Sequence, residues 1–173
     1  NGDTTYTAVF DVADANQTLS AVDLQVSGFA DTAGNLGGPT TLTDFIATID
    51  TDEPALGGIA RANADNTNAA TVDFTVTFDQ AVGSVAAGDF NLATTGGQGG
   101  ASITSVSGSG TTWTVTVSTV DGADGTIGLN LNDADSSIQD ANGNVLASVT
   151  ATGAVYTIDR TDPTLSAVDL LVG

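Results

Sequence analysis

The feature that most constrains this chain of 173 residues is a pair of motifs that recur at one spacing. Asp31-Thr-Ala-Gly-Asn-Leu36 matches Asp140-Ala-Asn-Gly-Asn-Val145. Ile49-Asp-Thr-Asp-Glu-Pro-Ala-Leu56 matches Ile158-Asp-Arg-Thr-Asp-Pro-Thr-Leu165. Both matches are displaced by 109 positions, from 31 to 140 and from 49 to 158. Because two separate anchors share one displacement, they indicate a tandem repeat of about 109 residues.

The hydrophobic pattern predicts strands along the whole chain. In 71–78 every second residue is apolar and the others are Thr or Asp, as in a half-buried antiparallel strand. The runs 6–10, 22–26, 113–117 and 127–131 repeat this alternation, and clusters of Gly, Asn, Asp, Thr and Ser separate them. The apolar positions of these strands predict one core between two sheets. Its residues are Val72, Phe74, Val76, Trp113, Val115, Val117, Ile127, Leu129, Leu131 and Ile158.

One further match does not follow the 109-residue spacing. Thr18-Leu-Ser-Ala-Val-Asp-Leu24 is identical to residues 164–170. Since it is a single short segment of common residues, we treat it as secondary to the two anchors, and the sequence offers no physical reason for it.

The composition excludes several function classes. Two arginines against twenty aspartates and one glutamate give a net charge of −19, which repels nucleic acid and anionic membranes and attracts cations. The chain has no His, Cys or Lys, so the common catalytic bases and nucleophiles are missing. Asp133 and Asp135 could form a carboxylate pair, but such pairs in loops are usually solvated or bind metal. We therefore predict a protein that is not an enzyme, without disulfides, nucleic-acid partners or membrane insertion.

The motifs resemble a known family. Asp-x-x-Gly-Asn in a late loop, followed by Ile-Asp and then Pro-x-Leu at a junction, is similar to the immunoglobulin-like tandem repeats of large secreted bacterial surface adhesins. The resemblance implies an all-β, immunoglobulin-like antiparallel β-sandwich of seven strands, export to the cell surface, and calcium at the domain junctions. On that plan residues 1–50 are strands E, F and G of one domain, 51–160 are a complete domain, and 161–173 are the first strand of the next. The complete domain would have its strands near Leu56 (A), at 71–78 (B), near Phe90 (C), near Ile103 (D), and at 113–118, 127–132 and 154–159 (E, F and G).

The same plan predicts where calcium would bind. The first junction would gather acidic and amide side chains from the end of one domain, the linker and two loops of the next. Calcium takes six to eight oxygen ligands, and carboxylates at such spacing repel one another strongly without a cation. Solvated turn residues, with Asp140 closing its own loop, remain the alternative. The predicted ligands are Asp11, Asp14, Asp50, Asp52, Glu53, Asp65, Asp140 and Asn142. At the second junction Arg160 and Thr161 replace acidic residues, and Arg160 could itself neutralise a carboxylate there.

The expected function is that of a structural spacer in an extracellular adhesin with calcium-stiffened junctions. Its partners would be neighbouring immunoglobulin-like repeats in the same or an adjacent chain. Two alternatives remain: a subunit of an extracellular fibre or sheath that assembles head to tail by strand complementation, and a module that binds a glycan or another ligand. The glycan alternative is the weakest, because the single tryptophan occupies a core-phased strand position.

Overall fold

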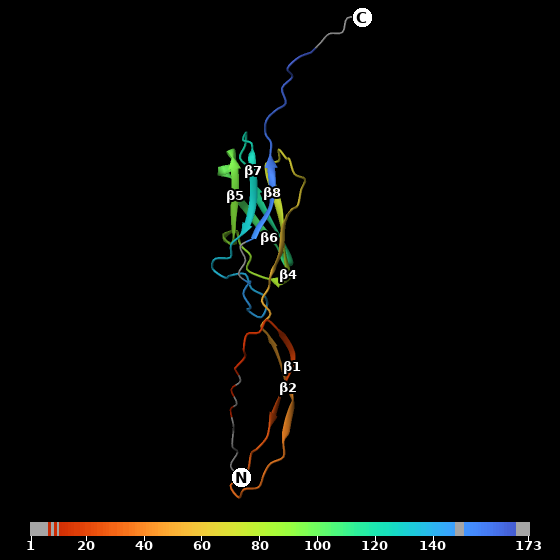
Figure 1. Cartoon of the computed structure of the whole chain (residues 1–173), viewed down its shortest axis with the longest axis vertical. Coiled ribbons are helices and arrows are strands. Elements are labelled where there is room, and N and C mark those ends of the chain that lie inside the picture. The colour runs from red at the N-terminus through yellow and green to blue at the C-terminus, as the bar shows by residue number, and fades with distance from the viewer. Residues whose placement is uncertain (1–6, 8, 10, 148–150, 169–173) are drawn as a thin grey trace, which may run out of the picture. The chain divides into compact units, whose positions relative to one another are not determined.

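The structure is a computed structural model of the chain (Figure 1). It describes residues 7, 9, 11–147 and 151–168, and for residues 21 and 42–47 it describes the backbone alone. The chain divides into two compact units, Asn1–Asp52 and Glu53–Gly173. The described structure is mostly β with two short 3-10 turns, so the predicted all-β class is confirmed.

The described part of the first unit contains one antiparallel pair of strands. Strand β1 (Thr18–Val26) pairs with β2 (Thr40–Asp50), with Thr18 opposite Asp50 and Val26 opposite Thr40. The third strand expected over 6–10 lies outside the described residues, apart from Thr7 and Val9, which belong to no strand.

The second unit contains two antiparallel sheets. One has the order β3 (Leu56–Arg61), β4 (Thr71–Val82), β6 (Ser102–Ser118). The other has the order β5 (Phe90–Gly96), β7 (Gly125–Leu131), β8 (Ala151–Ile158), and its strands run side by side in Figure 1. The short turns η1 (Ala87–Asp89) and η2 (Gly97–Gly100) flank β5.

Strand β6 differs from the sequence prediction, which placed separate strands near Ile103 and at 113–118. The structure has one continuous element, and its two halves fold back on each other. The hydroxyl oxygens of Ser102 and Ser118 are 3.0 Å apart, although a straight strand of that length would separate them by about 50 Å. The reversal passes through Gly108 (φ 150°) and Gly110 (φ 64°); a Cβ on Gly108 would lie 2.5 Å from the Thr112 carbonyl oxygen. The glycines therefore permit a hairpin so tight that no break interrupts the strand.

The core forms where the inward side chains of the two sheets meet. The predicted core residues are buried, except that Trp113 is half-buried and packs against the cluster. Tyr156 joins them; its ring meets Phe74 edge-on with centroids 5.1 Å apart. The remaining core residues outside the prediction are Phe78, Val82, Val85, Phe90, Ile138 and Leu146. Each large side chain buried in this way stabilises the fold by about 1.5–3 kcal/mol.

The segment 161–168 follows β8 and forms no strand. Its side chains Leu165 and Val168 are 81% and 79% exposed. The assignment of 161–173 to a following domain stays a prediction, and residues 169–173 lie outside the described part of the chain.

Candidate functional site

The two Asp-x-x-Gly-Asn motifs adopt one loop geometry. Asp31 accepts the backbone N–H of Asn35 on Oδ1 at 2.8 Å and the Asn35 side-chain amide on Oδ2 at 2.8 Å. Asp140 accepts the same two groups of Asn144, at 2.9 Å each. In both loops the glycine has a positive φ, 87° at Gly34 and 92° at position 143, and a bridge closes the loop. Each motif also lies in the connection between two paired strands, β1–β2 in one unit and β7–β8 in the other.

These hydrogen bonds explain why the motif needs an aspartate. The hydrogen bonds from Asn35 lower the pKa of Asp31. At Asp140 burial raises the pKa, but hydrogen bonds from Asn144 and Asn142 outweigh it, so the pKa is lowered overall. Both carboxylates are thus held ionised as acceptors of their own loops, which is the alternative that the sequence left open for Asp140.

The second repeated motif also takes one form in both places. Asp50 accepts the backbone N–H of Asp52 at 3.1 Å, and Asp159 accepts the backbone N–H of Thr161 at 3.1 Å. A carboxylate therefore closes a turn directly after the last strand of each unit.

The predicted calcium ligands are distributed over both units. Asp11, Asp14, Asp50 and Asp52 belong to the first unit, and Glu53, Asp65, Asp140 and Asn142 belong to the second. Because a shared site would require both units together, it stays a prediction.

Besides Asp140, three of these ligands also accept local hydrogen bonds. Asp14 accepts the backbone N–H of Asn16, and Asp50 accepts the hydroxyl of Thr18 at 2.8 Å. Asp65 accepts the backbone N–H of Thr157 at 2.8 Å and pairs with Arg61 at 3.5 Å. The Thr157 hydrogen bond is the main reason that the pKa of Asp65 is lowered.

A different acidic cluster lies within the second unit. Carboxylate oxygens of Asp89, Asp133 and Asp135 lie within 4.8 Å of one another, so they could hold a cation. Asp89 is 3% exposed and accepts the backbone N–H of Ala86 at 2.7 Å. Burial raises its pKa, and the neighbouring charges of Asp133 and Asp135 raise it further.

The hydrogen bonds around this cluster come mainly from Ser137. Its backbone N–H donates to Asp133 at 2.9 Å, and its hydroxyl lies 3.3 Å from Asp89. A hydrogen bond from Ser137 is also the largest cause of the lowered pKa of Asp135. The cluster therefore combines the buried carboxyl of Asp89, whose pKa is raised, with the exposed carboxyl of Asp135, whose pKa is lowered.

Sequence reasoning missed Asp89 but noted the other two residues as a pair. The proximity of Asp89 to the pair follows from the pairing of β5 with β7, in which Phe90 lies opposite Leu131. The residue before β5 must then lie beside the residues after β7, and the Asn132 N–H does donate to the Asp89 carbonyl at 2.7 Å.

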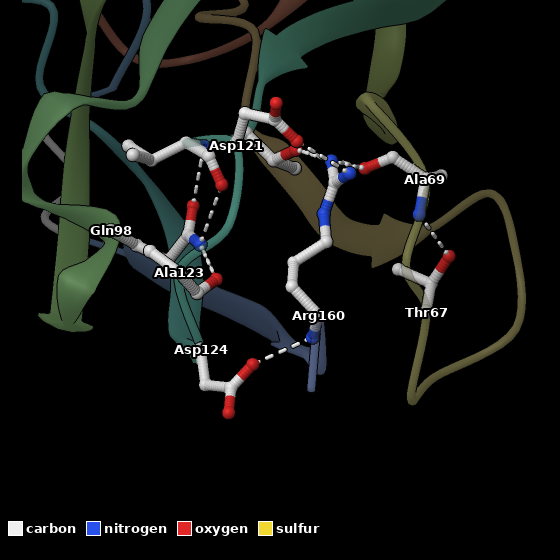
Figure 2. A network of polar contacts seen from close by, with 9 residues as sticks. Thr67, Ala69, Gln98, Asp121, Ala123, Asp124 and Arg160 are labelled. Carbon is white, nitrogen blue, oxygen red and sulfur yellow. Dashed lines mark hydrogen bonds and ion pairs between the residues drawn. The ribbon is translucent and has the colours of Figure 1, made fainter. Parts of the chain in front are cut away.

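The end of the second unit is organised around Arg160, as Figure 2 shows. Its guanidinium donates to the Thr119 hydroxyl at 2.6 Å and to the Ala69 carbonyl at 2.9 Å, and it pairs with Asp121 at 3.3 Å. Its backbone N–H donates to Asp124 at 2.6 Å. Arg160 thus pairs with a carboxylate at this end, as the sequence suggested.

Beside Arg160, the buried amide of Gln98 holds the loop that contains Asp121. It accepts the backbone N–H of Val120 at 2.8 Å and donates to the Ala123 carbonyl at 2.6 Å (Figure 2). These bonds satisfy backbone groups in a loop that has no sheet neighbour of its own.

Comparison with protein-family models, curated proteins and solved structures returned no match. Among the described residues no helix is long and apolar enough to cross a membrane.

Proposed function

We propose that this chain is a non-catalytic spacer from a tandem array of immunoglobulin-like domains in an extracellular bacterial adhesin. The observation that carries the proposal is the repeated supersecondary unit. In each unit two antiparallel strands enclose an Asp-x-x-Gly-Asn loop, and an aspartate turn follows the second strand. A unit that recurs at about 109 residues is typical of domain arrays.

The strand order supports the immunoglobulin-like part of the proposal. In a constant-type immunoglobulin domain one sheet has the order A-B-E-D and the other C-F-G. Strands β3 and β4 correspond to A and B, and the two halves of β6 correspond to D and E. Strands β5, β7 and β8 correspond to C, F and G.

The pairing at the ends of the second unit suits a spacer under tension. Residue Thr67, which follows β3, forms a parallel bridge with Ile158 in β8. The Thr67 N–H donates to the Thr157 carbonyl at 3.0 Å, and its carbonyl accepts the Asp159 N–H at 3.0 Å. The side chains of Arg61 and Asp65 add bonds to the backbone of β8 at 2.6 and 2.8 Å.

The parallel direction decides how this pairing responds to force. When the two ends of the unit are pulled apart, its first and last segments slide along each other, and all these bonds are loaded together. In an antiparallel pair of terminal segments the bonds would instead open one after another. The geometry therefore favours resistance to stretching.

Force spectroscopy on the whole chain tests the proposal. When held by its two ends, the second unit should unfold in one step that releases roughly 100 residues, or about 350 Å of extended chain. Gradual lengthening without such a step would refute the spacer function.

Calcium at the first junction is the second part of the proposal, and the donor set of carboxylate and amide oxygens supports it. Millimolar calcium should raise the melting temperature, because a ligand bound only to the native state stabilises it. The change Asp50→Asn with Asp52→Asn should remove most of that gain. Sodium chloride at matched ionic strength is the control, and equal stabilisation by sodium would mean general screening of the −19 charge.

A further inference from the structure

The segment that follows β8, at the end of the second unit, is a near copy of strand β1 in sequence. Residues 164–172 read Thr-Leu-Ser-Ala-Val-Asp-Leu-Leu-Val, and β1 reads Thr-Leu-Ser-Ala-Val-Asp-Leu-Gln-Val. Leu171 in place of Gln25 is the one difference across the bounds of the strand. Because β1 pairs with β2 in a defined register, its copy has the side-chain pattern needed for the same pairing.

In the described part of this copy, residues 164–168, no strand forms. The two large apolar side chains there, Leu165 and Val168, are about four-fifths exposed. A segment with the sequence of a strand and exposed apolar side chains is suited to pairing with another sheet.

The strand that it would replace is weakly held. In β1, Leu19, Leu24 and Val26 are 47%, 37% and 41% exposed. Within residues 11–52, β1 has β2 as its sheet neighbour. Because a two-stranded ribbon is marginally stable by itself, exchange of one strand for a near-identical one disturbs little.

We propose that residues 164–172 of one copy of this chain pair with β2 of a second copy, in the register of β1. Thr164 then lies opposite Asp50, Leu165 opposite Ile49, and Val168 opposite Ala47. The segment and its receptor strand are different surfaces, so the contact is head to tail and extends into an open filament. This inference concerns association between copies and goes beyond the spacer function, which a single chain can perform.

Two effects set the conditions for association. The resident β1 is attached to β2 through the chain, which gives it an effective concentration on the order of millimolar against an incoming strand. Copies of a chain with charge −19 also repel each other, so added salt should promote association. Replacing Leu24 by proline removes a backbone N–H from β1 and should promote association further.

The absence of cysteine from the sequence allows a direct test. One preparation carries Ile49→Cys and a second, of different mass through a tag, carries Leu165→Cys. Mixed under mild oxidation, they should form a disulfide-linked heterodimer at least about tenfold faster than a matched mixture with Ser166→Cys in place of Leu165→Cys. The Ser166 variant has the same exposed segment but presents its thiol one residue out of register.

Two outcomes would overturn the inference. One is equal heterodimer formation in the two mixtures, which would mean random collision of exposed thiols. The other is unchanged association, in the Leu24→Pro background, after residues 163–173 are deleted. Neither outcome bears on the spacer function, because force spectroscopy reads one isolated chain.

Discussion

The hydroxyl of Tyr156 offers the sharpest test of the packing described here. The side chain is fully buried in the core, and its hydroxyl lies between two backbone groups from other segments. It accepts the Asn63 N–H at 2.9 Å and donates to the Asp73 carbonyl at 2.6 Å. Replacement by phenylalanine keeps the ring and its edge-on contact with Phe74 but leaves both backbone groups without this partner.

The size of the effect follows from those two bonds. A hydrogen bond lost at a buried site destabilises by about 1–3 kcal/mol when the remaining group stays unsatisfied. Because Asn63 is exposed to solvent and the Asp73 carbonyl also accepts the Ala62 N–H at 2.9 Å, we expect Tyr156→Phe to lower the free energy of unfolding by about 2 kcal/mol rather than by the full sum. With a urea m-value of about 2 kcal/mol/M, the midpoint should fall by about 1 M.

The single tryptophan makes the assay specific. Trp113 belongs to the second unit, so its fluorescence during urea unfolding reports that unit. The control is Thr112→Val, which removes an exposed hydroxyl on β6 and should change stability by less than about 0.5 kcal/mol. A midpoint for Tyr156→Phe that matches the control would refute the role assigned to the hydroxyl.

Three further predictions concern buried polar groups. Gln98→Leu should destabilise the second unit by about 2–4 kcal/mol in urea unfolding, because the Val120 N–H and the Ala123 carbonyl lose their hydrogen bonds to the Gln98 amide. Arg160→Lys should recover little of the stability lost in Arg160→Ala, since one ammonium cannot reproduce the planar guanidinium fork; equal melting temperatures for Arg160→Lys and the unchanged chain would contradict this. The raised pKa of Asp89 means that this one carboxyl keeps its proton to a higher pH in the native state than in the unfolded state, so its own contribution to stability falls as pH rises from 3.8 through the folded-state pKa. Asp89→Asn should flatten that fall in melts across the acidic range, and an unchanged slope would contradict the assignment.

The strand pattern could be predicted from the sequence because alternation records which face is buried. Val72, Phe74 and Val76 are apolar at every second position, and all three are buried. Trp113 has the right phase but lies near the β6 reversal, where it is only half-covered. Periodicity identifies the face of a residue and carries no information about how far the covering layer extends.

The hairpin within β6 and the acidic cluster were less accessible to sequence reasoning. Gly108 and Gly110 predicted a break between two strands, because glycine weakens a strand. In the structure these two glycines let the chain reverse direction within one continuous strand. Asp89 is 44 positions before Asp133, and only the antiparallel pairing of β5 with β7 brings them together. For Asp140 and Asn142 the sequence left two interpretations open, a calcium site or a loop closed by its own hydrogen bonds. It could not choose between them.

The direction dependence of mechanical unfolding tests the spacer account most directly. Cysteine handles at Ala55 and Thr161 would pull the parallel terminal segments in opposite directions along their length and load their bonds together. Handles at Ala55 and Ala151 lie at the same end of that pairing and would open its bonds in sequence. We predict that the first geometry needs a several-fold higher force at equal loading rate, and that Asp65→Ala lowers the force in that geometry alone, since forced unfolding follows the unfolding barrier. Equal forces in the two geometries would contradict the claim that this fold is built to carry tension between its ends.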